Sequence, residues 1–257
     1  MIDTHAHLFL KDFSEDLPAV IERARAAGVT KILMPNVDDS TVEALHRTEN
    51  EYDGYCSAMM GIHPTSIKED YIRRLNRVVA WLQKRTYRAI GEIGIDLHWD
   101  RTFLKEQITA FEEQLTWAKA LNLPVVIHVR DSFPYVMESI YKVGPETLKG
   151  VFHSFGGSVD EAREIMNLQT FKMGINGIVT FKNSSLGNTL SSVPPEFPVL
   201  ETDAPYLSPV PYRGKRNEPA YMAGTLQKLA DIYRLSEREM DEITTNNAKS
   251  LFGFDDE

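Results

Sequence analysis

Two histidines near the start of the chain have the spacing of a metal-binding pair. His5 and His7 stand two positions apart in the segment 2–7. Because successive side chains of a β-strand point to opposite faces, residues i and i+2 share one face. An extended segment here would therefore let both imidazoles bind the same ion. Such a pair is equally typical of a polar surface, so its meaning depends on the rest of the chain.

Further candidate ligands follow short apolar runs that we expect to be strands. They are His63, Glu92, His128, His153 and Asp203. Taken singly, a histidine in this position is often a hydrogen-bonded core residue, and an aspartate can cap a loop. A buried carboxylate such as Glu92, however, needs a nearby cation. Together these nitrogen and oxygen donors indicate Zn²⁺ or Mn²⁺, with Mg²⁺ as a further possibility.

The donor set also suggests a reaction. If Glu92 bridges two ions about 3.5–4 Å apart, the ions can lower the pKa of a shared water and stabilise the attacking and leaving oxygens of a displacement at phosphorus. This arrangement suits phosphoester hydrolysis. It suits amide hydrolysis and deamination equally, so the residues alone predict a metal-dependent hydrolase without identifying the bond.

The elements that must position these side chains alternate along the chain. We expect eight strands, at residues 2–7, 29–35, 55–61, 87–93, 124–128, 151–153, 171–175 and 198–200. We expect helices at residues 18–27, 40–50, 69–85, 103–121, 132–141, 160–168, 220–234 and 237–252. Residues 174–195 are rich in Asn, Ser and Gly, which predicts an irregular loop with at most one short helix.

Short apolar strands without strict alternation are typical of parallel strands buried on both faces. Both a doubly wound open sheet and a barrel have this alternation of strands and helices. We favour an α/β fold of the (β/α)8 TIM-barrel type, because metal-type residues follow nearly every strand and a barrel gathers them at the C-terminal ends of its strands. The 257 residues match one barrel of about 250, so we expect a single domain over residues 1–257.

Composition excludes several classes of protein. Hydrophobic residues make up 42% and charged residues 25%, as in an ordinary globular protein. The only cysteine, Cys56, has no partner for an internal disulfide and is expected to be a small buried side chain in a reducing compartment. We see neither a signal peptide nor a run of about 20 apolar residues, and therefore expect a cytoplasmic protein. The net charge of −9 argues against binding nucleic acid by bulk electrostatics.

Longer motifs spread over the chain carry a resemblance to a known family. They are His-x-His at 5–7, Gly-Ile-His-Pro at 61–64, Gly-Glu-Ile-Gly-Ile-Asp at 91–96, Ile-His-x-Arg-Asp at 127–131, His-Ser-Phe at 153–155, Glu-Thr-Asp-Ala-Pro-Tyr-Leu at 201–207, Arg-Gly-Lys-Arg-Asn-Glu-Pro at 213–219 and Asn-Ala-Lys-Ser-Leu-Phe at 247–252. The sequence resembles the TatD family of metal-dependent deoxyribonucleases, in the amidohydrolase superfamily. The blocks at 201–207 and 213–219 are the most specific.

This resemblance implies a TIM barrel with two divalent metal ions per chain, Mg²⁺, Mn²⁺ or Zn²⁺. It implies that His5, His7 and Asp203 bind one ion, that His128 and His153 bind the other, and that Glu92 lies between them. It also implies hydrolysis of DNA phosphodiesters from the 3′ end of single strands. Glu92 and Asp203 would then be both ligands and catalytic residues, with Asp203 accepting or orienting the proton of the attacking water.

Substrate contacts are expected from the same end of the barrel. The candidates are His63, Arg130, Lys182, Tyr206, Arg213 and Lys215. Arginine offers a planar fork to phosphate and lysine a point charge, while Tyr206 or Trp99 can stack on a base. Alternatively, Arg130 forms an ion pair with Asp131 or Glu201, Lys215 belongs to a solvated turn, and Trp99 packs in the core.

Two departures from the family pattern concern the substrate. The family commonly has aromatic residues where this chain has Leu97 and His98, and often has histidine in place of Tyr212. Neither position is a predicted metal ligand. The way in which a nucleotide is held is therefore less well predicted than the chemistry.

Other functions remain open at this point. The same ligands would serve a deacylase acting on aminoacyl-tRNA, for example D-aminoacyl-tRNA, or a hydrolase of small phosphoesters. A non-catalytic binding protein on a barrel scaffold would be expected to have lost ligands, whereas none of the predicted ligands is missing. We expect single-stranded DNA as the substrate and find no sign of a membrane or an obligate protein partner.

Overall fold

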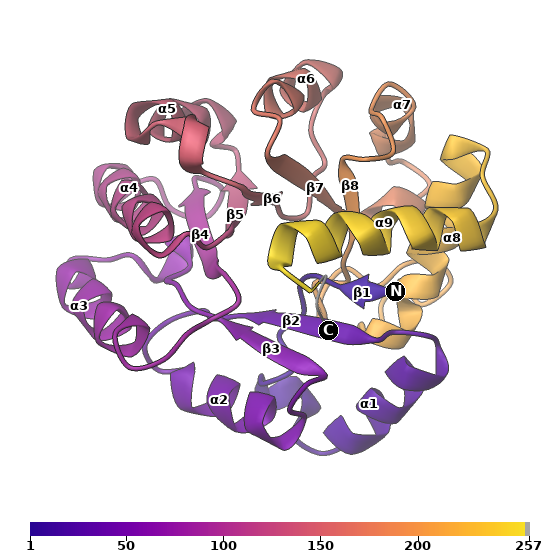
Figure 1. Cartoon of the computed structure of the whole chain (residues 1–257), viewed down its shortest axis with the longest axis horizontal. Coiled ribbons are helices and arrows are strands. Elements are labelled where there is room, and N and C mark those ends of the chain that lie inside the picture. Colours follow the sequence, from indigo (N-terminus) through magenta and orange to yellow (C-terminus); the bar gives the residue numbers. More distant parts are fainter. Residues whose placement is uncertain (255–257) are drawn as a thin grey trace.

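The computed structural model describes residues 1–254 and shows strands that alternate with helices (Figure 1). The strands are β1 (Ile2–Asp3), β2 (Lys31–Pro35), β3 (Cys56–Met59), β4 (Ile90–Asp96), β5 (Val125–Arg130), β6 (Gly150–Phe152), β7 (Phe171–Ile175) and β8 (Pro198–Leu200). The α-helices are α1 (Leu17–Ala26), α2 (Val42–Glu51), α3 (Tyr71–Leu82), α4 (Leu104–Leu121), α5 (Phe133–Val143), α6 (Val159–Asn167), α7 (Leu186–Leu190), α8 (Met222–Tyr233) and α9 (Glu237–Phe252). Short 3-10 helices cover Lys11–Phe13, Pro64–Ser66, Pro145–Thr147, Gly177–Thr180 and Pro219–Tyr221.

The parallel strands close into a barrel. They form two hydrogen-bonded arcs, β1-β2-β3 and β4-β5-β6-β7-β8. One seam is joined by the amide of Met60, which donates to the carbonyl of Ala89 at 3.1 Å, and the other by the amide of Thr4, which donates to Leu200 at 3.0 Å. The helices surround this ring of strands (Figure 1). The prediction of a (β/α)8 barrel is confirmed.

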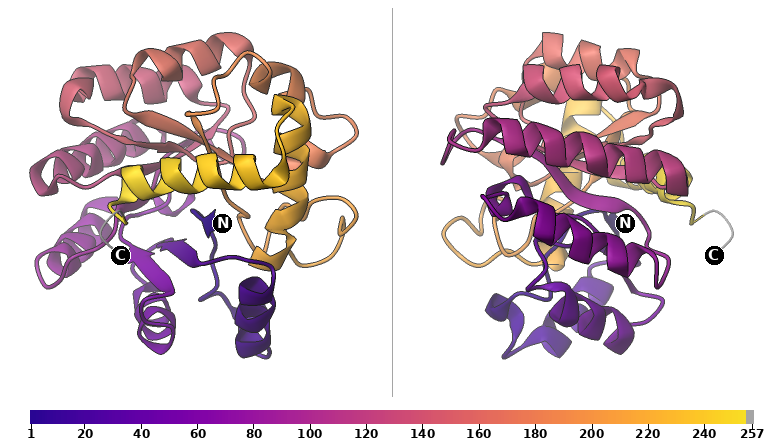
Figure 2. Two further views of the ribbon diagram at one scale, coloured as in Figure 1. Left: turned by 45° about the vertical axis from the view of Figure 1, so that its right-hand side comes forward. Right: turned by 90° about the vertical axis from the view of Figure 1, so that its left-hand side faces the viewer.

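One end of the barrel is filled by side chains. An inner cluster joins residues of the strands to the last helix: Ile2, Leu33, Met59, Ala89, Val126, Val151, Val199, Ala248, Leu251, Phe252 and Phe254. Helix α9 lies across this end, while the loop between β8 and α8 extends at the opposite end (Figure 2). Burial of apolar surface here closes the N-terminal end, so the C-terminal end is the one left open for a site.

Local signals explain some of the helix boundaries. Helices α6 and α9 each begin with a capping box, in which Ser158 pairs with Glu161 and Ser236 with Glu239. Helix α9 ends at Gly253, which has a φ of 73°. The expected loop at 174–195 contains a 3-10 turn and the short helix α7. No helix in the described part of the chain is long and apolar enough to cross a membrane.

Several strand boundaries differ from the sequence-based expectation, most of all in β1 and β4. Strand β1 ends at Asp3, so His5 and His7 lie just beyond it, although Ala6 between them still pairs with Ala204. Strand β4 runs to Asp96 rather than ending at residue 93. Its polar residues are buried among partners from other strands, which an apolar pattern does not reveal. Cys56 is 1% exposed, as expected for a small core side chain.

Candidate metal centre

The predicted ligands meet at the open end of the barrel. They come from separate strands or from the residues that follow them: His5 and His7 after β1, Glu92 in β4, His128 in β5, His153 after β6 and Asp203 after β8. All except His5 line a cleft of about 680 Å³, and His5 is fully buried beneath it. The C-terminal ends of the strands thus bring together residues up to 198 positions apart in the chain, from His5 to Asp203.

Backbone pairing places the first histidines against the end of β8. The carbonyl of His5 accepts from the amide of Asp203 at 2.8 Å, and the amide of His7 donates to Ala204 at 2.7 Å. This extended pairing turns both imidazoles to one side, as their spacing predicts. Asp203 has a φ of 57°, in the left-handed region that aspartate tolerates better than most residues.

The distances around His5 and His7 fit a divalent cation. Their Nε2 atoms are 3.1 Å apart. Oδ1 of Asp203 lies 3.8 Å from Nε2 of His5 and 3.6 Å from Nε2 of His7. Ligands that bind zinc tetrahedrally at 2.0–2.1 Å are themselves about 3.3 Å apart. These three side chains therefore form one set of donors whose spacing suits an ion.

Glu92 connects this set with a second one. Its Oε2 lies 3.2 Å from Nε2 of His5, while its Oε1 lies 2.9 Å from Nδ1 of His128. The carboxylate is buried and its two oxygens face different imidazoles. This is the geometry expected of a bridging ligand.

His63 is part of the second set. Its Nε2 lies 3.3 Å from Oε1 of Glu92 and 3.2 Å from Nδ1 of His128. Among residues 1–254, three groups have ligand atoms within 4.8 Å of one another: His5, Glu92 and His153; His5, His7 and Asp203; His63, Glu92 and His128. The distances thus pair His128 with His63, whereas the family resemblance implies that His128 pairs with His153.

Two further carboxylates orient the histidines from outside the cluster. Oδ2 of Asp96 lies 2.8 Å from Nε2 of His128, and Oε1 of Glu201 lies 3.0 Å from Nδ1 of His153. A carboxylate on the far nitrogen fixes the ring and its tautomer. Sequence reasoning missed both roles, although Asp96 and Glu201 stand within motifs of the resemblance. A Cβ on Gly174 would lie 2.1 Å from Oε2 of Glu201, so the glycine leaves room for that carboxylate.

The buried carboxylates of the cluster stabilise positive charge on or beside the imidazoles that they face. Burial by itself would raise the pKa of Glu92, but the imidazoles of His63 and His5 outweigh it and hold the pKa well below its usual range. Burial by itself would lower the pKa of His153, but the carboxylates of Glu201 and Asp203 raise it to about 10. Burial and neighbouring His153 lower the pKa of His5 to about 4. Ionised carboxylates facing imidazoles can hold a proton or, equally, a divalent cation.

Only some of the predicted substrate residues lie at the cleft. His63, Arg130 and Tyr206 line the cleft. Lys182, Arg213 and Lys215 are exposed and are not among the lining residues. The guanidinium carbon of Arg213 lies 3.7 Å from the ring centroid of Phe181. The structure therefore brings only the first three next to the candidate ligands.

The block at 213–219 anchors the loop after β8 to α1. Arg216 binds Asp16 at 2.7 Å, and Arg23 binds Glu218 at 2.6 Å. The side-chain amide of Asn217 donates to the carbonyl of Thr202 at 2.9 Å. A turn that sequence alone suggested as a solvated or phosphate-binding segment is thus held by partners near the other end of the chain.

The residues that depart from the family pattern have defined surroundings in the structure. Leu97 is buried, and Nδ1 of His98 lies 3.1 Å from Oδ2 of Asp131. Tyr212 stacks on Tyr221 with centroids 3.8 Å apart. Of the alternatives, core packing of Trp99 is wrong, because this residue is 73% exposed and lines the cleft.

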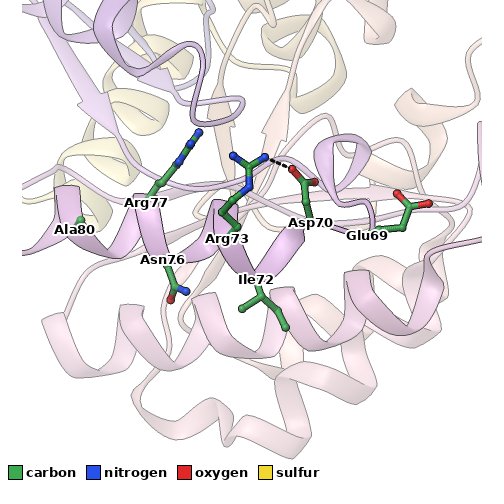
Figure 3. A pocket seen from close by; sticks show the side chains of 7 residues that line it. All are labelled: Glu69, Asp70, Ile72, Arg73, Asn76, Arg77 and Ala80. Atoms are coloured by element: carbon green, nitrogen blue, oxygen red, sulfur yellow. Dashed lines mark hydrogen bonds and ion pairs between the residues drawn. The ribbon is translucent and has the colours of Figure 1, made fainter.

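Another hollow of about 650 Å³ lies along the outer face of α3 and is lined by Glu69, Asp70, Ile72, Arg73, Asn76, Arg77 and Ala80 (Figure 3). Both arginines that line it are paired with nearby carboxylates. Arg73 pairs with Asp70, as Figure 3 shows, and Arg77 pairs with Asp39. None of the three groups of candidate metal ligands found among residues 1–254 lies here.

Comparisons with known proteins agree with this geometry. The profile of a family described as TatD related DNase matches residues 2–253. An uncharacterized metal-dependent hydrolase, YabD of Bacillus subtilis, is 37% identical over 98% of each chain. A protein of Klebsiella pneumoniae named 3'-5' ssDNA/RNA exonuclease TatD is 33% identical over 99% of this chain and 98% of that one. The crystal structure of YJJV, a TatD homolog from Escherichia coli, has a TM-score of 0.91 and 30% identity over 98% of each chain.

Proposed function

The chain belongs to the family of TatD related DNases and is a metal-dependent hydrolase, and on this premise we propose that it removes nucleotides from the 3′ end of single-stranded DNA. The observation that carries the proposal is Glu92, whose two oxygens face two sets of imidazoles at the open end of the barrel. The exonucleases among its relatives support the choice of substrate. The cleft of about 680 Å³ beside the cluster is the place where a strand end would bind.

We propose that the ligands are those predicted from the sequence: His5, His7, Glu92, His128, His153 and Asp203. The distances support the set of His5, His7 and Asp203, while the pairing of His128 with His153 rests on the family resemblance. Two divalent ions, when bound, would supply an activated water and positive charge at phosphorus. The side chains of the protein hold and orient this arrangement. Asp96 and Glu201 fix the rings of His128 and His153, so that their inner nitrogens face the cluster.

The remaining polar groups of the cleft act on the phosphodiester. His63 and Arg130 can donate hydrogen bonds to the nonbridging oxygens as negative charge develops on them. Asp203 takes the proton of the attacking water, because it is the more exposed carboxylate of the cluster, at 14% against 3% for Glu92. Attack by the water in line with the leaving 3′ oxygen breaks the P–O3′ bond and releases a nucleoside 5′-monophosphate, and the 3′ oxygen left on the strand takes up a proton to become a hydroxyl.

The test is digestion of a single-stranded DNA oligonucleotide labelled at its 5′ end. Metal-stripped protein is assayed alone and with Mg²⁺, Mn²⁺ or Zn²⁺ added back, and Glu92→Ala serves as the inactive control. We expect metal-dependent shortening from the 3′ end that the control lacks. If metal binds but no oligonucleotide is cut, the proposal is wrong, and release of amino acid from D-aminoacyl-tRNA or of phosphate from small esters identifies the alternative.

Replacing His63 with alanine separates its two possible roles. If His63 contacts substrate, His63→Ala should retain the wild-type metal content and lose about 10²-fold in turnover, the usual effect of removing one charge-stabilising donor. Metal content is measured by elemental analysis of the dialysed protein, and turnover by oligonucleotide hydrolysis. Loss of one ion per chain would instead place His63 among the ligands, as its 3.3 Å distance to Glu92 allows.

A further inference from the structure

Trp99 exposes an indole at the edge of the metal-binding cleft. At 73%, it is the most exposed large apolar side chain in residues 1–254. It lies just after β4 and lines the cleft together with His128 and Asp96. A single exposed apolar side chain is common on protein surfaces, so the significance of Trp99 depends on the groups that lie beside it.

The backbone that carries Trp99 is firmly held. The carboxylate of Asp96 accepts a hydrogen bond at 2.9 Å from the amide of His98, the residue before Trp99. The amide of Leu97 donates to the carbonyl of Arg130 at 2.9 Å. Because Asp96 also contacts His128, the backbone segment that carries the indole is connected to the candidate metal centre. A platform that is ordered before binding loses less entropy when a ligand arrives.

Arg130 supplies positive charge beside this indole. It follows His128 by two positions on β5, so the two side chains share a face, with Arg130 about 6.6 Å further out along the strand. Its guanidinium carbon lies 5.4 Å from the indole centroid. Within residues 1–254 it has no ion pair with a carboxylate, since Asp131 contacts His98 instead. The fork of Arg130 is therefore available for an anion.

We propose that Trp99 and Arg130 form a nucleotide subsite, in which an unpaired base stacks on the indole and Arg130 binds a phosphate of the same strand. This inference rests on the proposed nuclease function. Base stacking on an aromatic side chain is tolerant of sequence. Because a base within a duplex is already stacked on both sides, only single strands or frayed ends can use the subsite, which makes it a determinant of strand specificity.

The first test is steady-state hydrolysis by the metal-loaded enzyme. The substrates are a dT 12-mer and a 12-mer whose last nucleotides at the 3′ end are abasic. Trp99→Ala should raise KM for the dT 12-mer by about 5- to 100-fold, leave kcat nearly unchanged and have little effect on the abasic substrate. Trp99→Phe should restore most of the affinity, whereas Arg130→Ala should lower kcat/KM for both substrates.

The matched control is Tyr141→Ala, which removes a 54% exposed aromatic side chain of α5 that does not line the cleft. It should leave KM unchanged. The second test is independent of turnover: a phosphorothioate dT 12-mer should quench tryptophan fluorescence of the wild type, and Trp99→Phe should lose this quenching.

These two measurements distinguish the subsite from the proposed function. If the wild type cuts the dT 12-mer but Trp99→Ala has an unchanged KM and Trp99→Phe retains the quenching, the subsite is overturned and the nuclease stands. If the wild type cuts no oligonucleotide, the nuclease proposal fails. In that case quenching that depends on Trp99 supports the subsite as a nucleic-acid contact, and its absence overturns the subsite as well.

Discussion

Asp203→Asn should lower turnover on single-stranded DNA by about 10²- to 10⁴-fold, the range expected when a positioned proton acceptor is lost. Oδ1 of Asp203 lies 3.6 Å from Nε2 of His7 and 3.7 Å from Nε2 of His153. The side chain also lines the cleft, where water can contact it. Burial alone would raise the pKa of Asp203, but His153 and the other facing imidazoles lower it. The group is therefore ionised and able to accept a proton from water, which an amide of the same shape cannot do.

The substitution should leave the fold intact. The φ of 57° at this position suits asparagine as well as aspartate, and the backbone bond to His5 does not involve the side chain. Thermal unfolding, metal content and kcat should be measured together, with the exposed Asp160→Asn as a control that keeps wild-type turnover. Near-normal turnover by Asp203→Asn would remove Asp203 from the proton-transfer step. Loss of metal without loss of fold would show that its main role is as a ligand.

Much of the barrel could be predicted because its local signals agree with its fold. The run Val125-Val126-Ile127 is a strand buried on both faces, and the Ser236–Glu239 capping box marks the start of α9. The end of β4 could not be predicted in the same way. Asp96 is 3% exposed, and its carboxylate is stabilised by His128, a residue 32 positions away. A buried acid within a strand becomes understandable only once that partner is known.

The candidate ligands were predictable for a related reason. Histidine and carboxylate side chains that directly follow apolar runs must gather at one end of a parallel barrel. The orienting carboxylates were missed because Glu201 acts through His153, and no spacing in the sequence joins those two residues. The role of the basic turn near Arg216 likewise could not be predicted from the sequence of the turn itself. Its partner Asp16 lies 200 positions earlier in the chain.

Gly94→Ala should destabilise the fold by roughly 4 kcal/mol or more, a loss typical of severe steric mechanisms. Gly94 has a φ of 146°, a conformation that residues with a side chain rarely adopt. A Cβ at this position would lie 2.0 Å from the carbonyl oxygen of His128 on the neighbouring strand. The clash is with backbone, which cannot turn aside as a flexible side chain can. For a chain of this size the midpoint of thermal unfolding should fall by about 10 °C or more.

Gly187→Ala is the matched control, because Gly187 lies in helix α7 and a Cβ added there would lie 3.5 Å from Cδ1 of Ile232, an ordinary contact. That change should be neutral or slightly stabilising, since alanine favours helix. If Gly94→Ala unfolds at the wild-type temperature, β4 and β5 do not approach as closely as their register requires. If it is destabilised as expected, metal content should fall with it. The strand that carries Glu92 must pass against the strand that carries His128, so the spacing of these two ligands depends on a position where no side chain fits.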